Sequence, residues 1–252
     1  MEETPLDRIR TLECLAFNAW PALQTLVHDG WLLRFAHGHT KRANSVNVLW
    51  PGRTPLDRRI AHAEALYRQY HLPPTFRITP LCEPALDQAL AARGYATIDP
   101  TLVLEAPIDG LAALAAEGVE LADHAAPDWV DGFCAATATG PATRAVLGRM
   151  LAAVVPPAAF ARTRDASGAD LAFGMGVTEG EALGIFEMLT LPAARRRGLA
   201  ARTIAALARQ ARARGARRAY LQVVAANAAA RALYAKLGFA EVYAYGYRRL
   251  SA

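Results

Sequence analysis

The chain has 252 residues, of which 53% are hydrophobic and 20% are charged. This composition excludes a disordered chain and leaves room for one large domain or two smaller ones. The formal net charge is +5, carried almost entirely by arginine because Lys41 and Lys236 are the two lysines. Cys14, Cys82 and Cys134 lie far apart without a CxxC pair, which argues against a disulfide framework or a structural zinc site.

The charged start of the chain lacks the apolar segment of a secretory signal. The longest uncharged stretch, near residues 150–161, is too short to span a membrane and contains two prolines. We therefore expect a soluble, cytoplasmic protein that does not bind membranes.

Apolar periodicity and turn residues predict helices and strands in mixed order through the first half. Helices are expected at residues 5–20, 55–70 and 84–93, and strands at 30–36, 44–50, 75–79 and 101–105. Residues 107–118 form a predicted connecting segment with some helical character.

The second half begins with a predicted strand at residues 119–122, followed by helices at 128–138 and 141–154. Strands are expected at 159–164, 171–178 and 182–189, then a helix at 198–214, a strand at 219–224, a helix at 228–237 and a final strand at 242–249. Helices between strands indicate a mixed α/β fold with a twisted central sheet.

The two halves resemble each other in sequence. Placing Gly94 on Gly238, an offset of 144, sets ALDQALAARGYAT beside ARALYAKLGFAEV, with a strand one element earlier in both. We interpret the chain as two tandem copies of one α/β unit, residues 1–112 and 113–252, with the first copy degenerate. The alternative is a chance recurrence of strand, helix and glycine turn in an alanine-rich sequence.

The segment FEMLTLPAARRRGLAARTIAALA carries the clearest chemical pattern. A strand ends near Thr190, Pro192 blocks its continuation, and an R-x-x-G-x-A sequence from Arg195 to Ala200 opens a helix. Unpaired N–H groups and the dipole at a helix N-terminus suit a diphosphate, and Gly198 allows a close approach. The alternative is an ordinary helix start with solvated arginines.

In this context the sequence resembles the GNAT (general-control-related N-acetyltransferase) superfamily, through the loop above, the strand YLQVV, Asn227, ALYAKLGF and a tyrosine-rich last strand. The resemblance covers about the last 130 residues and implies the GNAT fold, here expected in two tandem copies. It implies that the loop binds the diphosphate of acetyl-CoA and that the preceding strand holds the pantetheine arm.

The implied acetyl-CoA-binding residues are Met188, Leu189, Thr190, Arg195, Arg196, Arg197, Gly198, Leu199, Ala200 and Asn227.

Two further residues carry both a structural and a functional interpretation. Asn227 precedes a helix, so its simplest role is an N-cap, and the resemblance adds contact with the pantetheine arm. Tyr234 has the position of the family's usual general acid, which protonates the departing thiolate. It also lies at helical spacing from Leu237 and is compatible with plain core packing. In the first half Leu90 takes the place of Tyr234, so that half is not expected to catalyse the reaction.

Glu187 is the candidate general base, because the attacking amine must lose a proton. It lies in the apolar strand GIFEMLT, where an unpaired carboxylate is unfavourable. Strand alternation predicts that it shares a face with Ile185 and Leu189. An ion pair with an arginine is an equally good explanation.

We expect an acetyl-CoA-dependent N-acetyltransferase that acts by direct attack of a primary amine, without a metal ion. The expected acceptor is a small molecule, and the chain is expected to be a monomer or homodimer that binds no nucleic acid. The alternatives are a non-catalytic acyl-CoA-binding or sensing module and an arginine-driven nucleic-acid binder, for which no reading module is present.

Overall fold

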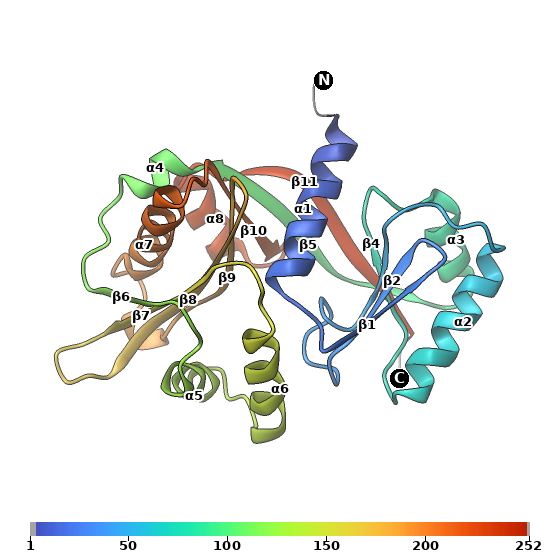
Figure 1. Ribbon diagram of the computed structural model, residues 1–252, viewed down its shortest axis with the longest axis horizontal. Coiled ribbons are helices and arrows are strands. Elements are labelled where there is room, and N and C mark those ends of the chain that lie inside the picture. Colours follow the sequence, from blue (N-terminus) through green and yellow to red (C-terminus); the bar gives the residue numbers. More distant parts are fainter. Residues whose placement is uncertain (1–3, 251–252) are drawn as a thin grey trace. The chain divides into compact units, whose positions relative to one another are not determined.

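The computed structural model describes residues 4–250 (Figure 1), which form two compact units. The first comprises residues 4–102, 224–226 and 242–250, and the second comprises 103–223 and 227–241. The units do not follow the chain linearly, because most of the last strand belongs to the first unit. The predicted division into copies at residues 1–112 and 113–252 describes sequence repeats, not compact units, and it stays a prediction.

Within the described residues, the first unit consists mainly of short strands and three helices. Its elements are α1 (Pro5–Ala19), β1 (Gln24–His28), β2 (Trp31–Phe35), β3 (Val46–Val48), α2 (Leu56–Gln69), β4 (Thr75–Ile78), α3 (Pro84–Ala92), the first part of β5 (Ala96–Pro107) and most of β11 (Ala240–Arg249). Within the unit the strand order is β1-β2-β3-β4-β11-β5, in which β3 and β4 are parallel.

One face of the first unit's sheet is apolar. Side chains of β2, β3 and β4 form a core with α2 and α3, as the alternation of strand residues requires. The buried members of this core are Trp31, Leu33, Phe35, Val46, Ile60, Ala63, Tyr67, Phe76, Leu86, Leu90 and Tyr95.

The opposite face of the same sheet carries a buried ion pair with α1. Arg77 alternates with the core residue Phe76, and its Nη2 donates to Glu13 Oε1 at 2.7 Å. The Tyr243 hydroxyl donates to the same carboxylate oxygen. The Arg77 guanidinium lies 3.7 Å from the Tyr245 ring centroid. Glu13 and Arg77 are each less than 5% exposed, so the pair is shielded from water.

The second unit is an open sheet with helices on both faces. Its elements are the end of β5, α4 (Ile108–Ala112), β6 (Val119–Ala122), α5 (Pro127–Ala136), α6 (Pro141–Ala152), β7 (Ala158–Arg164), β8 (Asp170–Glu179), β9 (Ala182–Thr190), the 3₁₀ turn η1 (Pro192–Ala194), α7 (Leu199–Ala213), β10 (Arg218–Val224) and α8 (Ala228–Lys236). The strand order is β5-β10-β9-β8-β7-β6. Strands β6 to β9 are antiparallel, whereas β9 and β10 are parallel.

Glycines in β8 let α7 lie close to this sheet. A Cβ atom at Gly174 would lie 2.6 Å from Thr203 Cγ2, and one at Gly176 would lie 3.0 Å from Leu207 Cδ2. Figure 1 shows α7 on one side of the sheet and α5 with α6 on the other. The two strand glycines therefore serve close helix packing, as expected where another element approaches the backbone.

Most predicted elements are confirmed, including the helix at residues 5–20 and the strand at 119–122. The structure adds β1, an exposed strand that the sequence analysis missed, and lengthens the predicted strand at 101–105 into β5. Among residues 4–250, no helix is long and apolar enough to cross a membrane. The same residues contain no cluster of three or more His, Cys, Asp or Glu side chains arranged to hold a metal ion.

Candidate functional site

Strand β9 contains a bulge at Glu187. Phe186 lies opposite Met175 and Leu189 lies opposite Phe173, so two residues of β9 face the single residue Gly174. Glu187 has a φ of 48°, in the left-handed region. A bulge interrupts the regular strand pairing, and such bulges often lie beside active sites.

The bulge corrects the predicted orientation of this strand. Phe186 and Leu189 share one face, whereas Ile185 lies opposite Gly176 on the other face. The prediction that Ile185 and Leu189 share a face with Glu187 is therefore wrong, because the extra residue shifts the alternation. Burial chiefly raises the pKa of the Cys134 thiol on α5, and Glu187 adds to the increase, so this half-buried carboxylate lies within electrostatic range of α5.

Strands β9 and β10 separate just where the bulge begins. Their parallel pairing ends at Ile185 opposite Leu221, although β9 continues to Thr190 and β10 to Val224. Ligands in open α/β sheets commonly bind beyond the carboxyl ends of parallel strands. The loop before α7 follows β9, and Asn227 with α8 follows β10, so both connections leave from this edge.

The loop before α7 presents an exposed row of backbone donors. Arg196 and Gly198 both have positive φ values, 61° and 76°, and Gly198 is the N-cap residue. The first N–H to bond the carbonyl four residues earlier is that of Arg202, to Gly198. Among residues 4–250, the N–H groups from Arg196 to Ala201 donate to no backbone carbonyl. These are the orphan donors of a helix N-terminus.

The space beside Gly198 on its Cβ side is open, and the Arg202 side chain turns back to donate to the Arg197 carbonyl at 3.0 Å. A Cβ atom at Gly198 would have no neighbouring atom within 4 Å. Arg195, Arg196 and Arg197 are exposed, and within the described residues their guanidinium groups form no ion pair. The loop therefore has the donors, the positive charge and the open approach that an anion needs.

The turn between β7 and β8 lies near this loop. The Ser167 hydroxyl and the N–H groups of Ala169 and Ser167 lower the pKa of Asp165, and the positive charge of Arg197 contributes. Asp165 Oδ1 accepts from the Ser167 N–H at 2.8 Å and from the Ala169 N–H at 3.0 Å. Because this carboxylate bonds within its own turn, it leaves the donors of the α7 loop unoccupied.

Asn227 caps α8, as its position before the helix predicts. Its Oδ1 accepts from the Ala230 N–H at 3.1 Å. The residue is exposed, and its amide NH₂ forms no hydrogen bond within the part of the chain that the structure describes. The capping role therefore leaves two donors available to a ligand.

Tyr234 lies on α8 and is 8% exposed. Its ring contacts Phe239 in an edge-to-face arrangement with centroids 5.8 Å apart, so the side chain packs in the core as the alternative interpretation allows. Its role as general acid stays a prediction. Burial raises the pKa of the Tyr234 phenol, with no contribution from a neighbouring charge. The phenol therefore stays protonated at neutral pH and can serve as a proton donor.

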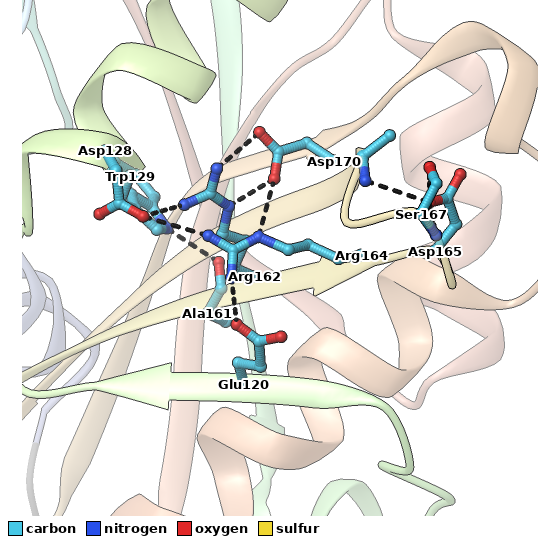
Figure 2. A network of polar contacts seen from close by, with 10 residues as sticks. Glu120, Asp128, Trp129, Ala161, Arg162, Arg164, Asp165, Ser167 and Asp170 are labelled. Carbon is cyan, nitrogen blue, oxygen red and sulfur yellow. Dashed lines mark hydrogen bonds and ion pairs between the residues drawn. The ribbon is translucent and has the colours of Figure 1, made fainter.

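A polar network fastens the start of α5 to the sheet (Figure 2). Arg162 on β7 forms two hydrogen bonds with Asp170 on β8, and its Nη1 donates to Asp128 on α5 at 2.7 Å. Arg164 joins Asp128 to Glu120 on β6, with hydrogen bonds of 3.1 and 2.9 Å. The network fixes α5 on the sheet face opposite α7. Glu187 lies within electrostatic range of Cys134 on this helix.

A separate hollow of about 840 Å³ lies at the opposite end of α7. Arg209 Nε there donates to the Ala112 carbonyl at 2.9 Å, and Arg212 pairs with Asp109 at 2.5 Å. These two arginines hold α4 against the end of α7. The hollow lies away from the β9 edge and is not part of the candidate site.

The predicted site residues all lie in the second unit, at or after the carboxyl ends of β9 and β10. The sequence analysis missed the bulge and the strand separation, for which the sequence offers no direct signal. Together the loop, the bulge, Asn227 and Tyr234 supply anion donors, exposed backbone and a buried acid. Leu90, the counterpart of Tyr234, is fully buried in the apolar core of the first unit.

Comparisons with known proteins identify the family and the fold of the chain. A family model described as "Probable histone acetyltransferase Rv0428c C-terminal" matches residues 7–248. The chain is 28% identical over 248 residues to "Uncharacterized N-acetyltransferase YobR" of Bacillus subtilis (strain 168), an alignment that covers 96% of this chain and 99% of that protein.

Two solved structures have similar folds. A GCN5-related N-acetyltransferase from Kribbella flavida superposes with a TM-score of 0.67 at 16% identity, covering 97% of this chain and 95% of that one. A tandem GNAT protein from the clavulanic acid biosynthesis pathway superposes with a TM-score of 0.65 at 16% identity, covering 96% and 88%. At these identities the similarity establishes the fold.

Proposed function

We propose an acetyltransferase function from the premise that this chain belongs to the GNAT family described as probable histone acetyltransferase Rv0428c C-terminal. The second unit would bind acetyl-CoA and transfer its acetyl group to the primary amine of a small molecule. The observation that carries this proposal is the open row of N–H groups from Arg196 to Ala201 at the start of α7. A diphosphate suits these donors, and three adjacent arginines supply matching charge.

The bulged end of β9 would hold the reactive part of the donor. Backbone groups of Met188, Leu189 and Thr190 would bond the pantetheine arm and the thioester oxygen, beside the point where β9 and β10 separate. The Asn227 amide would donate to the same arm. Fixing the arm at both ends would aim the thioester carbonyl at the acceptor and exclude water from it.

The reaction would proceed by direct attack of the neutral amine nitrogen on the thioester carbonyl carbon. A C–N bond forms, the carbonyl oxygen gains negative charge, and backbone N–H groups near the bulge would stabilise that charge. The C–S bond then breaks as the carbonyl re-forms, and Tyr234 would give its proton to the departing sulfur. The amine proton would pass to Glu187 or to a water, while Glu187 as an ion-pair partner remains the alternative.

The tandem organisation is part of the same proposal. An offset of 144 carries α3 (Pro84–Ala92) onto α8 (Ala228–Lys236) and the first residue of β5 onto that of β11. The same offset sets α2 against α7 and β4 against β10 to within two residues. This agreement of element bounds supports two copies of one unit, with the first having lost the chemistry at Leu90.

An acceptor screen tests the proposed activity. The full chain is incubated with acetyl-CoA and a panel of small amines and lysine-containing peptides, and thiol release is measured. We expect thiol release with at least one small amine. Tight acetyl-CoA binding with no turnover on any acceptor would favour a binding or sensing module, and turnover on peptides alone would contradict the small-molecule acceptor.

A further inference from the structure

The loop before α2 in the first unit is the counterpart of the loop before α7. The offset of 144 places Gly198 on Thr54, and each loop leads into the long helix that follows a parallel strand. Pro55, the N-cap residue of α2, makes no side-chain capping bond of its own. Unlike the α7 loop, however, this loop has no open donors at its centre, because a carboxylate of the same unit occupies them.

Asp29 is that carboxylate. The Arg53 N–H donates to both of its oxygens, at 2.9 and 3.0 Å, and the Thr54 N–H donates to Oδ2 at 2.7 Å. These bonds lower the pKa of Asp29 to about 2, the Arg53 contribution being the largest. The carboxylate is therefore negatively charged at neutral pH and satisfies donors that a bound anion would otherwise satisfy.

The position of Asp29 is built into the hairpin that joins β1 and β2. Asp29 and Gly30 are the two residues between these strands and have φ values of 42° and 85°, as an Asp-Gly type I′ turn requires. The Gly30 carbonyl accepts from the N–H groups of Leu49 and Trp50, at 2.9 and 3.2 Å. The turn is thereby fastened to the loop, with its carboxylate directed at Arg53 and Thr54.

A buried cation completes the arrangement. The Arg59 side chain is 4% exposed and pairs with Glu83, to which its Nη2 donates at 2.7 Å. Its Nε donates to the Thr54 carbonyl at 3.1 Å and lies 4.0 Å from Asp29 Oδ2. Its Nη1 is buried with no hydrogen-bond partner. A Cβ atom at Gly52 would lie 2.7 Å from this nitrogen and 2.8 Å from Asp29 Oδ2, so all three groups meet at one point. Backbone donors and a guanidinium around one carboxylate are the parts of an oxyanion site.

We propose that the loop before α2 is an oxyanion-binding site whose occupant is the chain's own Asp29 carboxylate. The N–H groups of Arg53 and Thr54 already bond Asp29, whereas within residues 4–250 the N–H groups around Gly198 donate to no backbone carbonyl. The consequence, which rests on the proposed function, is that each chain takes up one diphosphate-bearing carrier, through the second unit. Removal of Asp29 would convert the first loop into a site for a small oxyanion.

Titration of the full chain with inorganic pyrophosphate tests this proposal. Asp29→Gly removes the carboxylate and tolerates the positive φ, so we expect it to bind one more pyrophosphate per chain than the wild type. Asp57→Asn is the matched control, because Asp57 is a carboxylate in the first turn of α2 itself but is exposed and pairs with Arg93. It should not gain a site. Equal stoichiometry in Asp29→Gly and wild type would overturn the proposal.

A second variant covers the case in which Asp29→Gly fails to fold. Asp29→Asn tolerates the positive φ of the turn but carries no charge, so it holds the two N–H groups more weakly and pyrophosphate can displace it. Pyrophosphate should therefore raise the melting temperature of this variant more than that of the wild type. No difference would count against the proposal. A wild-type chain that binds no pyrophosphate would contradict the proposed function instead, since the Asp29 proposal depends only on the difference between variant and wild type.

Discussion

Tyr234→Phe separates chemistry from binding at the proposed site. The substitution removes only the hydroxyl, which forms no hydrogen bond within residues 4–250, and keeps the ring that contacts Phe239. Folding and acetyl-CoA affinity should therefore change little. The turnover number should fall, because the departing sulfur loses its proton donor.

The magnitude follows from the pKa values of the two partners. A thiol leaving group has a reference pKa near 8.5, whereas burial raises the pKa of Tyr234 above its usual value of 10.0. Proton transfer to sulfur is thus uphill by at least about 1.5 pKa units, or about 2 kcal/mol, unless the sulfur is desolvated as well. General acids contribute about 10²- to 10⁴-fold, and this mismatch places the expected loss of kcat near 10²-fold.

Stopped-flow measurement of thiol release gives kcat, and calorimetry gives the acetyl-CoA Kd. In the wild type the raised pKa of Tyr234 keeps the acid protonated, so kcat should not decline on its account until the pH exceeds 10. A variant with unchanged kcat would remove Tyr234 from the role of general acid. A variant with normal kcat but weakened acetyl-CoA binding would make it a binding residue.

Two stability predictions concern packing in each unit. Glu13→Gln leaves the Arg77 charge buried without its counterion and should lower the free energy of unfolding by about 3 to 5 kcal/mol in urea titrations; a loss below about 1 kcal/mol would contradict the buried pair. Gly132→Ala should lower the free energy of unfolding by about 1 to 3 kcal/mol, because its Cβ would lie 2.5 Å from Asp170 Oδ2. The control is Gly148→Ala in α6, where a Cβ has open space. This variant should raise the free energy of unfolding by up to about 1 kcal/mol. Equal melting temperatures for the two alanine variants would refute the close contact.

Periodicity and turn residues predicted the long helices well, because their apolar stripes are continuous. The helix predicted at 55–70 became α2, with Ile60, Ala63 and Tyr67 buried. Strand β1 was missed because its five residues are exposed or half-exposed and carry no alternating pattern. The Asp29-Gly30 pair was the available signal, since this dipeptide favours a two-residue hairpin.

The candidate site was predicted in part. The R-x-x-G-x-A pattern led to the helix start at Gly198 because glycine adopts the left-handed conformation found there. The prediction that Ile185 and Leu189 share a face was wrong, because one extra residue in a strand inverts the alternation and leaves no mark in composition. The hydrogen-bond partners of Asp29 could not be predicted from the sequence either, because Arg53 and Thr54 donate through their backbone N–H groups.

The central claim is that the loop around Gly198 binds the diphosphate of the acyl carrier. Its most direct test is the affinity of wild type and Gly198→Val for acetyl-CoA and for S-acetylpantetheine, which lacks the diphosphate. Loss of two charge-assisted hydrogen bonds of about 1.5 kcal/mol each predicts acetyl-CoA binding weakened roughly 100-fold in the variant, with S-acetylpantetheine binding unchanged. Wild-type acetyl-CoA affinity in Gly198→Val would contradict the account.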